Sequence, residues 1–238
     1  MATDYLERGA VAGVAGGLVY GLFVATVGNA FTAGLETFEH GHSHGGGGSV
    51  VSELTTAVAS VGGGVLWGVL FGVAAFGMAY FFLEPALPGA GATKRLALAG
   101  AGFLTVSGAP WLVLPPQPPG VEQALGTDAR LAWYAGLMVL GALVAVLAGL
   151  AVRRTADRHA AVRLAAAAAP LALLAVPVVL APANPVHGDV PAALVAAYRW
   201  TVVFGQLLLW ASIAGVHAWL GDSGTRATEE LDYPATAD

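Results

Sequence analysis

Long apolar runs separated by short polar segments dominate the chain. Six of these runs are long enough to cross the roughly 30 Å hydrocarbon layer of a bilayer, for which about 20 helical residues suffice. They cover approximately residues 9–31, 57–83, 96–114, 131–152, 163–183 and 197–220. The pattern predicts an all-α fold, in which residues 1–238 form one polytopic membrane domain with six transmembrane helices and a disordered C-terminal tail over residues 222–238.

The third and fifth runs are the least regular of the six. The third ends in Ser107-Gly108-Ala109-Pro110-Trp111, and the fifth carries Pro170 and Pro177. Proline kinks or breaks a helix, but a bundle tolerates kinks because neighbouring helices satisfy the freed backbone groups. A re-entrant fifth run would disturb the distribution of basic residues across the membrane, so six complete crossings are expected.

The basic residues predict the orientation of these helices. With six crossings, only Arg130 and Arg199 lie on one side of the membrane. The other side holds Arg8, Lys94, Arg95, Arg153, Arg154, Arg158, Arg163 and Arg226. Basic residues concentrate in cytoplasmic loops, so both termini are expected in the cytoplasm and residues 32–56 outside. Asp4, Glu7 and Arg8 do not form the basic cluster of a secretory signal, so the first run is expected to remain as a helix.

Composition supports a multi-pass protein of the cytoplasmic membrane. Apolar residues make up 57% of the chain and charged residues 11%, whereas soluble domains contain about 25% charged residues. Cysteine is absent, which excludes disulfides, thiolate metal sites and cysteine nucleophiles. The net charge of -5, with a single lysine, is typical of a halophilic source such as a halophilic archaeon.

Glycines recur every four residues on the first two runs. Gly17 and Gly21 lie on the first, and Gly64, Gly68 and Gly72 lie on the second. This spacing places them on one helix face, where another backbone can approach closely. Tight helix packing is the favoured interpretation; an ion path lined by backbone and a homo-oligomer through these faces are the alternatives.

A polar segment between the first two runs carries the clearest metal signal. His40, His42 and His44 alternate with small residues and precede four glycines, with Glu36 and Glu39 just before them. Imidazole and carboxylate without sulfur suit cobalt, nickel, zinc or copper(II). We expect this His/Gly-rich external loop, residues 32–56, to collect a divalent ion, and to bind it less well as pH falls through about 6.5. A solvated linker is the alternative.

His187 and Asp189 lie in another external segment, Asn184-Pro185-Val186-His187-Gly188-Asp189. Two interpretations of this segment remain open. The two residues are further metal ligands, or His187 belongs to a helix-entry turn and Asp189 caps the sixth helix, with Pro191 in its approach.

Polar residues inside the bilayer are candidates for an ion path because their burial in lipid is costly. They are Asn29, Thr105, Ser107, Thr201 and Gln206, together with His217 near the cytoplasmic end of the sixth run. Interhelical hydrogen bonds are the commoner role for such uncharged groups. For His217, an interfacial histidine beside Trp219 is the alternative to an exit-side ligand.

Several segments resemble the CbtA family, whose members are described as probable cobalt transporter subunits. The most specific are Gly-Ala-Pro-Trp at residues 108–111 and Pro-Pro-Gln-Pro-Pro-Gly at residues 115–120. They belong to the longer stretches Gly102–Trp111 and Leu114–Gly120, and the other similar segments are Val61–Gly68, Tyr80–Pro88, Pro185–Pro191 and Phe204–Trp210. The resemblance implies cobalt(II) uptake linked to cobalamin supply, with a small single-span, histidine-bearing partner, CbtB. The family is usually described with about five spans, whereas six are predicted here.

The sequence therefore predicts a divalent-metal permease subunit with cobalt, nickel or zinc as substrate and no permanently bound cofactor. No phosphate-binding loop is present, so uptake is facilitated, ion-coupled or dependent on a separate ATPase subunit. An intramembrane hydrolase is disfavoured because Ser107 and His217 are expected near opposite faces of the membrane. No enzymatic activity and no nucleic-acid partner are expected. The alternative is a metal-binding receptor or assembly subunit that does not transport.

Overall fold

The computed structural model describes residues 2–39, 50–118, 121–187 and 190–232. Within them the regular secondary structure is helical apart from two strands of two residues each, which confirms the all-α prediction. The first pair of long helices comprises α1 (Ala2–Phe23), η1 (Val24–Gly28) and α2 (Asn29–Glu39), followed by α3 (Val50–Phe71), η2 (Gly72–Ala79) and α4 (Tyr80–Leu83). The middle of the chain contains α5 (Ala92–Phe103), η3 (Leu104–Gly108), α6 (Ala109–Trp111), β1 (Glu122–Gln123) and α7 (Thr127–Arg154). The remainder is α8 (Ala160–Ala168), η4 (Ala169–Leu174), α9 (Ala175–Leu180), β2 (Val186–His187) and α10 (Ala192–Asp232).

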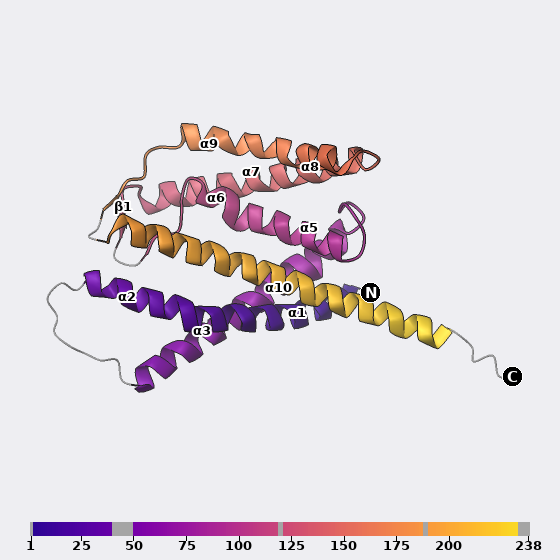
Figure 1. The fold of residues 1–238 in the computed structure, drawn as a ribbon, viewed down its shortest axis with the longest axis horizontal. Coiled ribbons are helices and arrows are strands. Elements are labelled where there is room, and N and C mark those ends of the chain that lie inside the picture. The colour runs from indigo at the N-terminus through magenta and orange to yellow at the C-terminus, as the bar shows by residue number, and fades with distance from the viewer. Residues whose placement is uncertain (1, 40–49, 119–120, 188–189, 233–238) are drawn as a thin grey trace.

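Five helical segments of the described chain are long and apolar enough to cross a membrane. They are Ala2–Leu35, Ser52–Leu83, Thr127–Arg154, Ala160–Leu180 and Ala192–Asp222. The third predicted run also forms a helix, over residues 92–111, and lies in the bundle beside α7 and α10 (Figure 1). Two cationic residues in its first turn and several glycine, serine and threonine residues lower its hydropathy. The structure therefore supports five crossings by length and composition, and the sixth stays a prediction.

The ends of the bundle are distinct. Helix α1 begins and α10 ends at the same end, whereas the end of α2, the start of α3 and both strands lie at the other (Figure 1). Helices also occupy both ends of the predicted 32–56 loop, because α2 extends to Glu39 and α3 begins at Val50. Helix α10 continues to Asp232, so helical backbone covers most of the segment for which a disordered tail was predicted.

Four long segments are not regular α-helices throughout. Segments η1, η2 and η3 are π-helical, and η4 is a 3₁₀ segment that begins directly before Pro170. Proline lacks the N–H of the helical ladder, so the change of helix type at Pro170 has a local cause. The helix nevertheless continues through Pro177 in α9 and remains long enough to cross the membrane.

Helix α1 packs between α3 and α10, and the glycine strips form its contact with α3. A methyl group placed at Gly17 would lie 2.5 Å from the Gly64 carbonyl oxygen, and one at Gly64 would lie 2.5 Å from the Cα of Gly21. Gly13 and Gly68 approach each other in the same way. These contacts confirm tight packing as the role of the glycines. They also occupy the faces that were predicted for a homo-oligomer, so any oligomer would need other surfaces.

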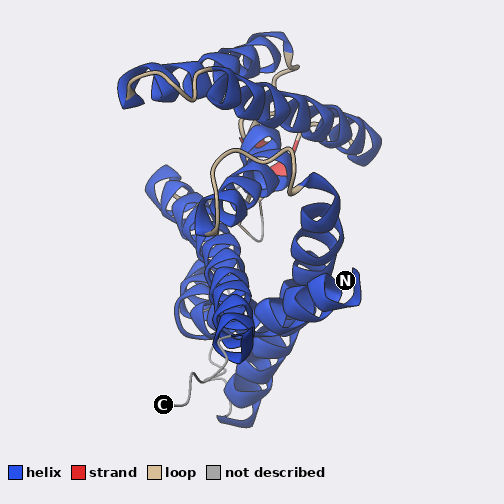
Figure 2. Ribbon diagram, turned by 90° about the vertical axis from the view of Figure 1, so that its right-hand side faces the viewer, coloured by secondary structure: helices blue, strands red, loops and turns tan. Residues whose placement is uncertain are grey.

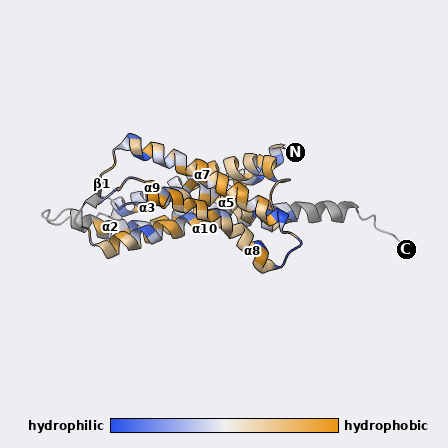
Figure 3. Ribbon diagram, turned by 90° about the horizontal axis from the view of Figure 1, so that it is seen from above, coloured by the Kyte–Doolittle hydropathy of each residue, from blue (hydrophilic) through white to orange (hydrophobic). Residues whose placement is uncertain are grey.

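The core lies where α1, η2, α5 and α10 meet. Phe76, Tyr80, Trp210 and Ile213 are buried there. A second, smaller cluster of Ala109, Val144 and Leu174 joins α6, α7 and η4. Helices α7, α8 and α9 form the upper layer in Figures 1 and 2, and apolar residues cover most of the length of the helices in Figure 3. Large exposed side chains such as Phe82, Trp200 and Val179 fit contact with lipid.

Strands β1 and β2 pair in antiparallel register at the end of the bundle opposite the start of α1. Glu122 lies opposite His187, and Gln123 lies opposite Val186. Asn184 strengthens this connection, since its amide nitrogen donates to the Gln123 side chain at 3.0 Å and its oxygen accepts from the Leu125 N–H. A second contact ties the proline-rich loop to α10, where Arg199 donates to Gln117 at 3.0 Å. These loops are therefore attached to the bundle at several points.

Candidate functional site

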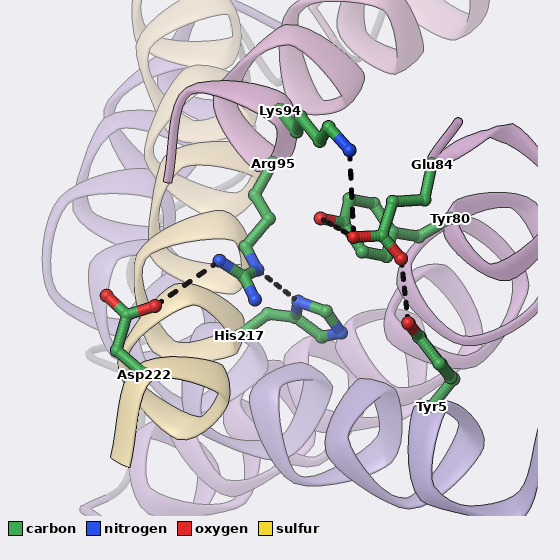
Figure 4. Close-up of polar contacts among 7 residues, drawn as sticks. All are labelled: Tyr5, Tyr80, Glu84, Lys94, Arg95, His217 and Asp222. Carbon is green, nitrogen blue, oxygen red and sulfur yellow. Dashed lines mark hydrogen bonds and ion pairs between the residues drawn. The ribbon is translucent and has the colours of Figure 1, made fainter. Parts of the chain in front are cut away.

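Ionisable and polar side chains gather at the end of the bundle where α1 begins and α10 ends (Figure 4). They come from α1, α4 and the turn after it, α5 and α10. The members are Tyr5, Tyr80, Glu84, Lys94, Arg95, His217 and Asp222, which we call the polar cluster. Charged groups are expensive inside a membrane protein and mark functional sites when they occur there.

His217 is the most deeply buried member, with 1% of its surface exposed. Its ring packs against Phe76, with centroids 5.5 Å apart, and edge-on against Tyr80 at 5.2 Å. The Nε of Arg95 donates a hydrogen bond of 3.2 Å to Nδ1 of His217. A neutral imidazole that accepts at Nδ1 carries its proton on Nε2. Nε2 is buried and has no hydrogen-bond partner among the described residues.

Arg95 connects α5 to α10. Its side chain is only 11% exposed, and its guanidinium lies 5.6 Å from the centre of the Tyr80 ring, within cation–π range. Its Nη1 lies 3.6 Å from Oδ1 of Asp222. Gly221 leaves room for the Arg95 side chain in this position, because a Cβ at residue 221 would collide with the guanidinium. The position of Arg95 thus depends on a glycine next to its acidic partner.

Glu84 is the second centre of the polar cluster. The Tyr5 hydroxyl donates to its Oε2 at 2.7 Å, and the Tyr80 hydroxyl donates to its Oε1 at 3.5 Å. The Lys94 ammonium lies 3.8 Å from the same Oε1. Because Tyr80 contacts both Glu84 and the ring of His217, it links the two centres.

Lys94 and Arg95 interact with the two groups that a divalent ion would otherwise bind, the Glu84 carboxylate and the His217 imidazole. Carboxylate and imidazole are suitable ligands for borderline divalent metals. A metal ion on Nε2 of His217 needs the lone pair of that nitrogen, but Nε2 carries the proton while Arg95 donates to Nδ1. An ion would therefore have to displace Arg95 from His217, and Lys94 from Glu84, before either group became a ligand.

The other residues predicted for an ion path have separate surroundings. Asn29 donates to Ser60 at 2.9 Å, which is the interhelical hydrogen bond that was the commoner expectation. Thr201 bonds instead to the Ala197 carbonyl of its own helix. Ser107 is 3% exposed in η3, and Gln206 is half-buried in α10.

The π-helical segment η3 also has a distinctive contact next to two of these residues. Tyr134 of α7 donates its hydroxyl proton to the Val106 carbonyl at 2.5 Å, between Thr105 and Ser107. Single-turn π segments interrupt the regular helical ladder and are frequent at functional sites. Here the hydrogen bond joins α7 to the irregular part of the neighbouring helix.

The predicted external ligands lie mostly beyond what the structure describes. His40, His42, His44 and Asp189 are outside the described residues. Glu36 and Glu39 belong to the last turns of α2, and His187 is in β2 opposite Glu122, although none of these side chains is described. Helix α10 begins directly after Pro191, whose carbonyl accepts from the Leu194 and Val195 N–H groups. His187 lies in β2, before the start of α10, and both interpretations of this segment stay predictions.

Among the side chains that the structure describes, no three histidine, aspartate or glutamate residues come together in a way that could hold a metal ion. The polar cluster has one carboxylate centre and one imidazole centre, each paired with a basic residue. No role was predicted from the sequence for most of its members, and Lys94 and Arg95 were used only to predict the orientation of the helices. Glu84 could have indicated this cluster, because it is a carboxylate directly after an apolar run.

Comparison with known proteins identifies a family for this chain. No curated protein and no solved structure shows significant similarity to this chain. The model of the CbtA family, described as "Probable cobalt transporter subunit (CbtA)", matches residues 2–222, nearly the whole chain. The match spans the five apolar helical segments found in the described chain as well as the polar cluster, so this chain is a multi-pass membrane protein of the CbtA family, described as a probable cobalt transporter subunit.

Proposed function

We propose that the protein takes up cobalt(II) from outside the cell, with nickel and zinc as competing ions. The observation that carries this proposal is the family match over residues 2–222 of a bundle with long apolar helices. Each elementary charge that moves through an inside-negative potential of 100 mV gains about 2.3 kcal/mol, so a divalent ion gains about 4.6 kcal/mol. A gated pathway could therefore accumulate the ion without ATP.

In the proposed topology, residues 92–111 form a sixth crossing and both termini are cytoplasmic. The positive-inside rule and the shared end of α1 and α10 support this arrangement. The polar cluster then lies on the cytoplasmic side, and the His/Gly-rich loop lies outside.

The proposed route begins at His40, His42 and His44, which collect the ion. The register of β1 and β2 supports a second external contact, since it brings Glu122 opposite His187. Glu84 and His217 are the last ligands before the cytoplasm, and Lys94 and Arg95 keep them occupied while no ion is present. This arrangement would close the inner end of the path.

The proposed partner is a small single-span subunit bearing histidine, of the CbtB type, in a system that supplies cobalt for cobalamin. The word "subunit" in the family description supports a partner of some kind. The surrounding bilayer is the other partner, since large apolar side chains are exposed along the helices.

A receptor or assembly subunit that binds metal without transporting it is the second candidate. One observation favours it: Lys94 and Arg95 place two positive charges at the inner end of the bundle. Like charges repel, so these residues would oppose the exit of a cation unless they move.

The deciding experiment uses purified full-length protein in liposomes that enclose a cobalt-quenched dye, with an inside-negative potential. Quenching in liposomes without any other subunit supports the permease, whereas cobalt binding without quenching supports the receptor. A variant with His40, His42 and His44 replaced by alanine should need more cobalt for half-maximal entry. His159→Ala is the matched control, because His159 is exposed in the turn before α8 at the other end of the bundle. An unchanged cobalt requirement in the triple variant would exclude the collecting role.

A further inference from the structure

A groove lies between the two halves of the bundle. It has a volume of about 740 Å³ and is lined by η2 and α4, by α5 and η3, and by α7. Small residues such as Ala75, Ala97, Gly100, Ala145 and Gly149 form much of its wall. A methyl group added at Gly100 or Gly149 would meet no other atom within 4 Å. The groove is therefore open space between the helices and not a packed contact.

The lining of the groove is apolar along its length and cationic at one end. Apart from Thr105 and Arg153, all its lining residues are aliphatic, aromatic or glycine. Arg153 lies at the end of α7, where its Nη1 donates to the Ala86 carbonyl at 3.0 Å. That bond uses one of the five guanidinium N–H donors. Exposed Arg154, Arg158 and Arg163 follow in the same region of the chain.

We propose that this groove binds an anionic phospholipid, with an acyl chain between α5 and α7 and the headgroup phosphate on Arg153. Apolar space between helices inside a membrane is unfavourable for water, so hydrocarbon is the natural occupant. A guanidinium at the end of the groove matches a phosphate in both charge and hydrogen-bond geometry. Basic pockets between transmembrane helices bind anionic headgroups in this way.

The size of the groove suits a lipid acyl chain. The observed volume lies within the range of about 300–1,000 Å³ that is usual for small-molecule sites. A flexible acyl chain can also follow the uneven wall formed by alternating alanine, glycine and leucine.

The test measures lipid retention on the purified full-length protein. The protein in detergent is mixed with equal amounts of phosphatidylglycerol and phosphatidylcholine that carry identical acyl chains, and bound lipid is counted by native mass spectrometry. The wild-type protein should retain phosphatidylglycerol in preference. Arg153→Gln should reduce this preference about fivefold, the factor expected for one basic residue at an anionic headgroup. Arg158→Gln is the matched control because Arg158 is exposed and does not line the groove.

A second pair of variants tests the apolar part of the site. Gly149→Leu places a side chain in the open groove and should lower retention of both lipids. Gly215→Leu is its control, since Gly215 is exposed on α10, has open space around it and lies outside the groove. Equal retention of the two lipids by the wild type, or equal effects of Arg153→Gln and Arg158→Gln, would overturn the proposal. The proposal would also be overturned by the finding that a second polypeptide displaces the lipid from the groove. If Gly149→Leu does not fold, the arginine pair decides.

Discussion

The contact between α1 and α3 makes a prediction that two adjacent residues can test. Gly63 and Gly64 lie side by side on α3, but only Gly64 faces α1. A methyl group at Gly63 would meet nothing within 4 Å, whereas one at Gly64 would lie 2.5 Å from the Cα of Gly21 and 2.7 Å from the carbonyl oxygen of Gly17. The substitutions Gly63→Ala and Gly64→Ala therefore add the same methyl group, but only the methyl group at residue 64 collides with α1.

Both substitutions gain the same helix propensity, about 1 kcal/mol for alanine over glycine. At Gly64 the new methyl group must also move α1 away by about 1 Å to reach an ordinary contact of 3.4 Å or more. Overpacking of this kind costs about 1–3 kcal/mol. Gly64→Ala should therefore be less stable than Gly63→Ala by about 1–3 kcal/mol, which corresponds to roughly 2–12 °C in Tm for a chain of this size.

The assay is thermal unfolding in a single detergent, followed by far-ultraviolet circular dichroism, with the wild type measured in parallel. Gly63→Ala should unfold at or above the wild-type temperature, and Gly64→Ala below Gly63→Ala. If both variants unfold at the same temperature, the backbone contact between α1 and α3 does not exist as described, and the glycine strip needs another explanation.

Three further predictions concern the polar cluster and the external loop. Tyr5→Phe removes the 2.7 Å hydrogen bond to Glu84 and should lower the free energy of unfolding by about 1–3 kcal/mol, as for other hydrogen bonds to charged groups; urea titration measures this, and an unchanged midpoint would show that the bond contributes nothing. Gly221→Ala should displace the Arg95 guanidinium and so disturb its hydrogen bond to His217; a shift of the His217 ring resonances in NMR is expected, and identical spectra would contradict the described position of Arg95. Cobalt binding to the external loop should weaken as pH falls from 7.5 to 5.5, because protonated imidazole cannot bind metal; calorimetry on the wild type should show this loss, and the variant lacking His40, His42 and His44 should not.

The membrane architecture followed largely from hydropathy. Apolar runs of about 20 residues predicted the helices, and five of the six predicted crossings meet the criteria of length and composition in the structure. The third run is the exception because its helix covers residues 92–111, and so includes Lys94 and Arg95, which precede the predicted run at 96–114. Helix ends were less predictable, since polar residues such as Glu36 can extend a helix beyond the hydrocarbon layer.

The packing faces were predictable only in part. A spacing of four residues identified Gly17, Gly21, Gly64, Gly68 and Gly72 as contact positions, because that spacing defines one face of a helix. The sequence did not say that the two strips face each other, since the pattern is the same for a contact within one chain and between two chains. The groove on α5 and α7 was not predicted either, because its wall combines residues from four separate segments of the chain.

The sequence by itself determined the membrane location, the helical class, the family resemblance and the histidine-rich loop as a candidate metal site. These properties depend on composition, run length and short motifs, which can be read along the chain. Only the tertiary structure decided that Arg95 binds His217, because the two residues are 122 positions apart. Arg95, which the sequence pattern placed among the loop charges, is thus a largely buried hydrogen-bond partner of His217. Hydropathy is a sum over neighbouring residues and can be calculated from the sequence. The polar cluster instead depends on which helices pack together, so it could be found only in the tertiary structure.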